Sequence, residues 1–192
     1  MLTQPTLANV SITPAPLTVT GLSGTARTYD ATTVDVLSGT GSLSGFFIGE
    51  TLTLGGITSG TLASANAGSE ALTTALTLAN RTGLASNYVL TQPTLANVTV
   101  TPAALTVTGL SGTARTYNAT TVDTLSGTGS LSGLFGVETL TLGSATNGTL
   151  ASANAGSEAL TTALTLVNGT GLASNYVLTQ PTLANVTITQ LH

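Results

Sequence analysis

The sequence predicts an all-β chain built from two tandem antiparallel β-sandwich domains. Three observations support this fold class: an internal repeat of 88 residues, short runs in which apolar and hydroxyl residues alternate, and frequent Gly, Ser, Asn and Pro between those runs. In a strand, alternation with a period of two sends one set of side chains to the core and the other to solvent. Short strands at regular spacing, separated by turn residues, are typical of an antiparallel sandwich.

The repeat is the strongest signal in the chain. Only 13 of 88 positions differ when residues 2–89 are aligned with residues 90–177. Two copies this similar indicate one structural unit used twice, and the period suits an independently folding domain rather than a solenoid coil. The predicted boundaries are 1–13 for the terminal strand of a preceding repeat, 14–101 for the first domain (repeat 1) and 102–192 for the second (repeat 2).

Seven or eight short strands are expected in each repeat, and threonine suits them because its branched Cβ fits a pleated surface. Their number and spacing favour an immunoglobulin-like sandwich. Residues 62–71 are the one helix-compatible segment, but Asn66 and Gly68 interrupt it, so a loop is favoured. A helix there would indicate β-grasp-like α+β units instead. The strands expected in the first copy are 17–22, 25–30, 32–37, 50–55, 58–63, 69–79, 86–91 and 95–101.

The connection between the repeats is short. Residues 102–104 join the closing strand of repeat 1 to the opening strand of repeat 2, and the first of them is a proline. Three residues including a proline cannot act as a long flexible tether. Neighbouring repeats are therefore expected to be partners of each other, held in a restricted, rod-like orientation.

The composition excludes several classes of function. Only 5% of the residues are charged, with three arginines and no lysine, whereas 59 residues are serine or threonine. Scattered cations cannot neutralise a row of phosphates, so nucleic acid is not an expected partner. Cysteine is absent and the single histidine is the last residue, which leaves few groups for acid–base or covalent chemistry. The chain is therefore predicted not to be an enzyme and to need no cofactor.

Membrane insertion is not expected either, although the mean hydropathy is +0.42. Residues 82–114 contain no charged side chain, but Pro93, Pro102 and runs of threonine interrupt the apolar stretch of about 20 residues that a spanning helix needs.

Each repeat contains two tyrosines that are flanked by polar, turn-forming residues. The favoured interpretation is that each ring caps the core while its hydroxyl ties down a loop. The alternative is an exposed aromatic side chain that binds a ligand. The four residues are Tyr29, Tyr88, Tyr117 and Tyr176.

One hairpin is predicted to vary more than the rest, because six of the 13 differences between the copies fall within 46–59. Drift in an exposed loop is the favoured interpretation, and a ligand-contacting tip is the alternative. The candidate contact residues are Phe46, Phe47 and Ile48 in the first copy and Leu134 and Phe135 in the second.

Acidic residues offer a weak case for calcium, which prefers six to eight oxygen ligands. Asp30, Asp35 and Glu50 could gather around an ion, but the second copy has Asn118 in place of the first aspartate. Solvated charges at turns and strand edges account for them better, so no metal is expected.

Five short motifs occur in the same order in both copies, and together they resemble the YDG domain. This domain occurs in tandem arrays within very large bacterial surface proteins of the filamentous-haemagglutinin type. The chain departs from the family motif at Ala31 and Ala119, which replace a glycine, and at Asn118, which replaces an aspartate. In the first copy the motifs span residues 17–21, 29–33, 66–69, 85–90 and 96–102.

The resemblance implies a secreted or surface-displayed adhesin stalk, extracellular or on the bacterial cell surface, with no enzymatic activity. A competing hypothesis is a binding module that grips a host glycan or protein. A third is a filament subunit that associates with itself by exchanging edge strands, because near-identical neighbours with little charge repulsion are prone to swap strands.

Overall fold

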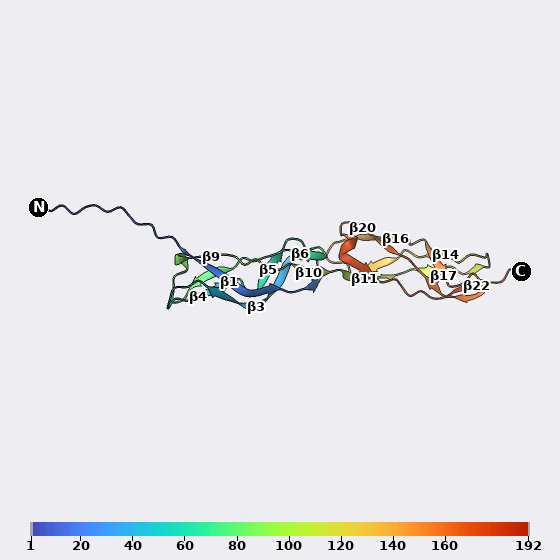
Figure 1. Cartoon of the computed structure of the whole chain (residues 1–192). Coiled ribbons are helices and arrows are strands. Elements are labelled where there is room, and N and C mark those ends of the chain that lie inside the picture. Colours follow the sequence, from blue (N-terminus) through green and yellow to red (C-terminus); the bar gives the residue numbers. More distant parts are fainter. Residues whose placement is uncertain (1, 192) are drawn as a thin grey trace. The chain divides into compact units, whose positions relative to one another are not determined.

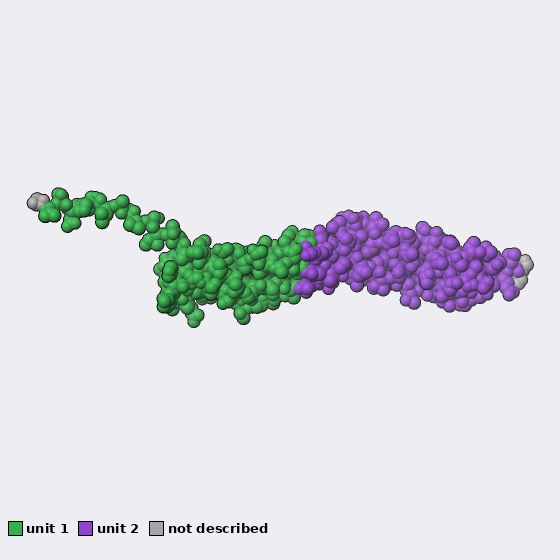
Figure 2. All heavy atoms as spheres, viewed as in Figure 1, with its two compact units in different colours: residues 1–25, 33–64, 70–98 green, residues 26–32, 65–69, 99–192 purple. Residues whose placement is uncertain are grey.

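A computed structural model describes residues 2–191 and confirms the all-β class with two tandem β domains (Figure 1). The chain divides into two compact units (Figure 2). Unit 1 contains residues 1–25, 33–64 and 70–98, and unit 2 contains residues 26–32, 65–69 and 99–192. Two segments of repeat 1 therefore belong to the same compact unit as repeat 2.

Both repeats contain the same series of short strands. In repeat 1 these are β1 (Ala15–Gly24), β2 (Arg27–Thr28), β3 (Val34–Ser44), β4 (Leu52–Gly55), β5 (Ser59–Leu62), β6 (Gly68–Glu70), β7 (Leu72–Thr73), β8 (Thr77–Asn80), β9 (Tyr88–Leu90) and β10 (Val98–Thr101), with a 3₁₀ turn η1 (Ala85–Asn87).

Repeat 2 follows the same order, with two of the long strands divided. Its strands are β11 (Ala103–Thr108), β12 (Ser111–Gly112), β13 (Arg115–Thr116), β14 (Val122–Ser126), β15 (Ser130–Ser132), β16 (Leu140–Gly143), β17 (Asn147–Leu150), β18 (Gly156–Glu158), β19 (Leu160–Thr161), β20 (Thr165–Asn168), β21 (Tyr176–Leu178) and β22 (Val186–Thr189), with a 3₁₀ turn η2 (Ala173–Asn175).

The main sheet of unit 1 has five strands in the order β7-β5-β3-β1-β9, and β4 pairs with β8 in a second sheet. Alternation along β1 places Leu17 and Val19 in the core and Thr18 on the surface. The pairing is mixed rather than antiparallel throughout, because β1 runs parallel to β9, with Ala15 opposite Tyr88. A period-two pattern specifies which face is buried but not the direction of the neighbouring strand.

Unit 2 contains the corresponding sheets of repeat 2 and two three-stranded sheets that close the repeats. In these, β10 lies between β2 and β6, and β22 lies between β13 and β18. One core cluster of unit 2 consists of Leu125, Leu150, Leu160, Val186 and Ile188, and another of Val107, Leu110 and Leu164.

The strand expected at 69–79 is divided into β6, β7 and β8. At the break, the Gln92 amide takes the place of a neighbouring strand: its Oε1 accepts from the Leu76 nitrogen at 3.0 Å and its Nε2 donates to the Leu76 carbonyl at 2.9 Å. Gln180 bonds Leu164 in the same way in repeat 2. A side chain thus satisfies backbone groups that would otherwise be left without a partner as the chain moves from one sheet to the other.

β3 extends well beyond the expected end at residue 37. The Gly39-Thr40-Gly41 sequence lies within this strand and forms a bulged part of the ladder between β1 and β3. Gly39 has φ +97°, and a Cβ there would lie 1.9 Å from the Gly21 carbonyl oxygen. Glycine is needed here for close approach of two strands rather than for a chain reversal.

Residues 2–14 form no strand, although a terminal strand was expected at 1–13. Their equivalents in repeat 1 include β10, which is held by β2 and β6. Among residues 2–191 no strand pairs with this segment, which therefore lacks the neighbours that make its counterpart a strand. No helix within residues 2–191 is long and apolar enough to cross a membrane.

The tyrosine motif forms a tight turn after β2 and after β13. Asp30 Oδ1 accepts from the Thr32 nitrogen at 2.9 Å, and the Asn118 Oδ1 accepts from the Thr120 nitrogen at 3.2 Å. The residue inside each turn is left-handed, with φ +62° at Ala31 and +59° at Ala119. The turn therefore forms with an amide in place of the carboxylate and with alanine in place of glycine.

Ala31→Gly and Ala119→Gly should each stabilise the chain by about 0.5–1 kcal/mol, because relief of roughly 1–2 kcal/mol of left-handed strain exceeds the entropic cost of glycine. Urea unfolding of the single variants measures this. Gly21→Ala is the opposite control, since Gly21 has φ +77° with open space around it and should lose stability through strain alone. A loss of stability in both glycine variants would contradict this interpretation.

Candidate functional site

The Glu138 carboxylate in unit 2 accepts hydrogen bonds from two tyrosine hydroxyls. The Tyr29 hydroxyl donates to its Oε1 at 2.6 Å, and the Tyr176 hydroxyl donates to its Oε2. The Tyr176 oxygen also accepts from the Phe135 backbone nitrogen at 3.1 Å. Two phenols thus share one carboxylate, an arrangement in which each bond has a charged acceptor.

The aromatic rings near this carboxylate pack against one another. The Tyr29 ring meets Phe135 edge-on at a centroid distance of 5.8 Å and Tyr176 edge-on at 5.3 Å. Such pairs contribute about 0.5–1.5 kcal/mol each beyond the area that they bury. Tyr29 is only 3% exposed as a result.

Two side-chain amides complete the contact. Asn175 Oδ1 accepts from the Ala67 nitrogen at 2.8 Å, and its Nδ2 donates to the Asn66 Oδ1 at 3.0 Å. Asn175 is 1% exposed. We call Phe135, Glu138, Asn175 and Tyr176 the socket of repeat 2, and segments 26–32 and 65–69, which carry Tyr29, Asn66 and Ala67, the plug of repeat 1.

The backbone around the plug fixes the position of its tyrosine. β2 runs parallel to β10, with Thr28 opposite Thr101, and the Tyr29 nitrogen donates to the Thr101 carbonyl at 2.8 Å. Arg27 forms an ion pair with Asp30 across the turn. Burial by itself would raise the pKa of Asp30, but hydrogen bonds from Thr32 and the Arg27 charge outweigh it and lower that pKa.

The socket changes the acidity of its phenols. Burial, and then the hydrogen bond to Glu138, raise the pKa of Tyr29 to about 12 and also raise the pKa of Tyr176. A raised phenol pKa means that the neutral form is preferred in the folded state. The resulting stabilisation is complete below the ordinary value of about 10 and is lost as the pH rises through 12.

Unit 1 contains the same four residue types at the equivalent positions, but without a plug. Tyr88 donates to Glu50 Oε2, and its oxygen accepts from the Phe47 nitrogen at 3.4 Å. These residues and Asn87 line an open pocket of 460 Å³, together with residues 12–15 and Ser86. We call Phe47, Glu50, Asn87 and Tyr88 the socket of repeat 1.

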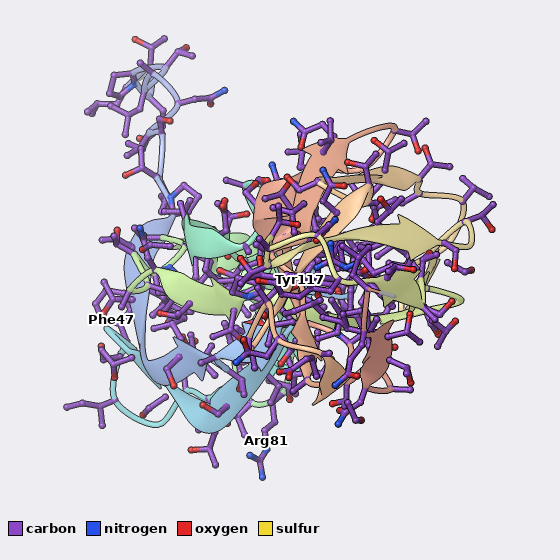
Figure 3. All side chains as sticks on the ribbon, turned by 90° about the vertical axis from the view of Figure 1, so that its right-hand side faces the viewer. Phe47, Arg81 and Tyr117 are labelled. Atoms are coloured by element: carbon purple, nitrogen blue, oxygen red, sulfur yellow. The ribbon has the colours of Figure 1, made fainter. Side chains whose placement is uncertain are left out.

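The equivalent segments of repeat 2, 114–120 and 153–157, are the plug of repeat 2, and the tyrosine of this plug is exposed. Tyr117, the equivalent of Tyr29, is 41% exposed, and its hydroxyl makes no hydrogen bond with residues 2–191. Phe47 is 68% exposed, and Figure 3 shows its ring projecting from the ribbon. Tyr117, Phe47 and Asn87 are exposed, whereas their counterparts Tyr29 and Asn175 are buried and Phe135 is half-buried; the socket tyrosines, Tyr88 and Tyr176, are buried in both repeats.

The segment predicted as a variable hairpin is a connection between sheets. β3 pairs with β1 and β5, whereas β4 pairs with β8, so residues 46–49 do not join two neighbouring strands. Phe46 packs against the core of unit 1, Phe47 and Ile48 are exposed, and Leu134 is half-buried. Phe135 belongs to the socket of repeat 2.

The candidate calcium ligands have separate structural partners. Asp35 Oδ2 accepts from the Thr25 nitrogen at 3.0 Å, whereas Glu50 bonds Tyr88 and Asp30 closes its own turn. Asp123 repeats the role of Asp35, and its Oδ1 lies 3.7 Å from the Arg115 Nε. No group of three His, Cys, Asp or Glu side chains suited to a metal occurs within residues 2–191.

The amide and the carboxylate that organise the socket were not apparent from the sequence. Sequence reasoning offers Glu50, the counterpart of Glu138, only as a candidate calcium ligand, and it gives Asn87, the counterpart of Asn175, no role beyond its place in a motif. Glu138 and Asn175 have identical counterparts in the other copy, so comparing the copies gives them no distinguishing signal.

The comparisons with known proteins identify one family. The YDG domain model matches residues 13–95 and again residues 101–183. No curated protein matches the chain, and no solved structure matches it either.

Tyr29→Phe should destabilise unit 2 by about 1.5–3 kcal/mol, because it removes a hydrogen bond to a charged acceptor and leaves the aromatic packing in place. Tyr117→Phe is the matched control and should change stability by less than about 0.5 kcal/mol, because its hydroxyl is exposed. Urea unfolding of both variants measures the difference. Equal effects of the two substitutions would show that the bond to Glu138 contributes nothing.

Proposed function

Because the chain belongs to the YDG domain family, as two tandem copies, we propose that it is a non-catalytic spacer in the stalk of a secreted or surface-displayed bacterial adhesin or extracellular fibre. Its sequence resemblance to the repeats of filamentous-haemagglutinin-type proteins supports this setting. A spacer needs units that fold independently and are joined without a flexible linker, and it needs no reactive site.

The bonding around Glu138 is the observation that carries the proposal. The site with the most concentrated polar and aromatic chemistry in unit 2 is filled by Tyr29 and the Asn66-Ala67 backbone and amide of repeat 1. Its groups are used to join one repeat to the next. A site for an external ligand would instead leave such groups available to that ligand.

Two buried aspartates also support a structural rather than a catalytic role. Asp35 and Asp123, each 1% exposed, accept hydrogen bonds from the backbone of nearby turns. Buried carboxylates held in this way stabilise local structure, and neither lies beside a second carboxylate or a histidine in a metal-binding group among residues 2–191.

A binding module is the second candidate function, and exposed apolar side chains favour it. Phe47 is 68% exposed and the neighbouring Ile48 is fully exposed. Exposed aromatic residues at a loop tip are suited to contact a host glycan or protein.

A glycan array and a pull-down with host-surface proteins, both using the whole chain, separate the two functions. The spacer proposal predicts no reproducible binding at micromolar concentration. Micromolar binding that is lost in Phe47→Ala, and kept in Thr18→Ala as an exposed control on β1, would overturn it in favour of the binding module.

A further inference from the structure

We propose that the socket of repeat 1 binds the plug of repeat 2 from a second copy of this chain, so that the copies associate head to tail. The inferred partner surface is Tyr117 with the Ala153-Asn154-Ala155 segment. The proposal concerns association between chains and does not depend on where the protein is displayed.

The two sockets are built from the same residue types. Phe47, Glu50, Asn87 and Tyr88 repeat Phe135, Glu138, Asn175 and Tyr176 residue for residue. The phenol-to-carboxylate bond and the bond from the loop nitrogen to the phenol oxygen form in both. The socket of repeat 1 is therefore already folded into the form that holds Tyr29 in repeat 2.

The socket of repeat 1 lacks the contacts that the plug makes with the socket of repeat 2. Glu138 uses both carboxylate oxygens, whereas Glu50 uses Oε2 and receives no hydrogen bond on Oε1 from residues 2–191. Asn175 is buried and doubly bonded, whereas Asn87 is exposed. The 460 Å³ pocket lies beside these groups.

The backbone at Tyr117 in the plug of repeat 2 pairs in the same way as the backbone at Tyr29 in the plug of repeat 1. β13 runs parallel to β22 with Thr116 opposite Thr189, and the Tyr117 nitrogen donates to the Thr189 carbonyl at 2.8 Å. Tyr29 has the same bond, at 2.8 Å, to the Thr101 carbonyl. Tyr117 thus needs no rearrangement to present its hydroxyl, which reduces the cost of binding.

These contacts use two different surfaces of the chain, so the association is heterologous and each added copy leaves one plug and one socket open. One buried aromatic ring, one charged hydrogen bond and two amide contacts make a surface well below the roughly 1,200–2,000 Å² of a stable complex. Association is therefore expected to be weak and to become visible towards about 1 mM protein, which corresponds to only about −4 kcal/mol.

Sedimentation equilibrium on the whole chain, over a concentration series reaching about 1 mM, tests the proposal. The wild type should show an average mass that rises with concentration. Tyr117→Ala removes the plug ring and Phe47→Asp places a second negative charge beside Glu50, so each variant alone should remain monomeric. Mixed together, they should form a 1:1 complex and nothing larger, because one supplies the intact socket and the other the intact plug.

Two controls distinguish docking of the plug from a general effect of added charge and from strand exchange. Ile48→Asp adds the same charge to the same loop, but outside the pocket lining, and should associate like the wild type. The N-terminal counterpart of β22 is residues 10–13, so deletion of residues 2–11 leaves only two of the four residues that could exchange with β22, and docking of the plug predicts that association survives it. The substituted side chains Phe47, Ile48 and Tyr117 are exposed, and circular dichroism of each variant checks that it remains folded.

Three results would overturn the proposal. The first is a wild type that stays monomeric up to the highest concentration. The second is a mixture of the Tyr117→Ala and Phe47→Asp variants that stays monomeric although the wild type associates. The third is loss of association on deletion of residues 2–11. The last result would assign self-association to strand exchange instead.

Discussion

The structure depends on one carboxylate that is shared by two buried phenols. Glu138 is half-buried and accepts the hydroxyls of Tyr29 from repeat 1 and Tyr176 from repeat 2, whose rings pack against each other. Removing a charge from water is costly unless hydrogen bonds replace those that the water made. The same bonds that satisfy Glu138 therefore join the two repeats within unit 2, which also contains segments 26–32 and 65–69 of repeat 1.

A chain with so few charges uses hydroxyls and amides for tasks that ion pairs perform in other proteins. Gln92 and Gln180 bond the backbone where a strand changes sheets, and Asn175 bonds the backbone of the plug. Two of the few carboxylates accept hydrogen bonds from more than one donor group, as Glu138 does from two phenols and Asp30 does from the Thr32 nitrogen and hydroxyl. Low charge is thus compatible with a well-bonded structure, and it leaves little on the described surface that would bind an ionic ligand.

Much of the fold was predictable because burial follows the alternation of residues. The inward positions of β1 and the loop after β5 were predictable from Leu17, Val19, Asn66 and Gly68. Strand direction was not, because the parallel pairing of β1 with β9 leaves no mark on the alternation. The socket was also beyond sequence reasoning, since the same residues occur in both copies and only the folded chain shows that Tyr29 is buried and Tyr117 is exposed.

The ionisation of the Tyr29 phenol shows whether its hydroxyl is buried against Glu138. Tyrosine labelled with ¹³C at Cζ can be titrated by NMR, with the Tyr29 signal assigned from the Tyr29→Phe variant. The account predicts a Tyr29 midpoint near pH 12 that falls in Glu138→Gln. A Tyr29 phenol that ionises at the ordinary value of about 10, in the wild type and in Glu138→Gln alike, would contradict it.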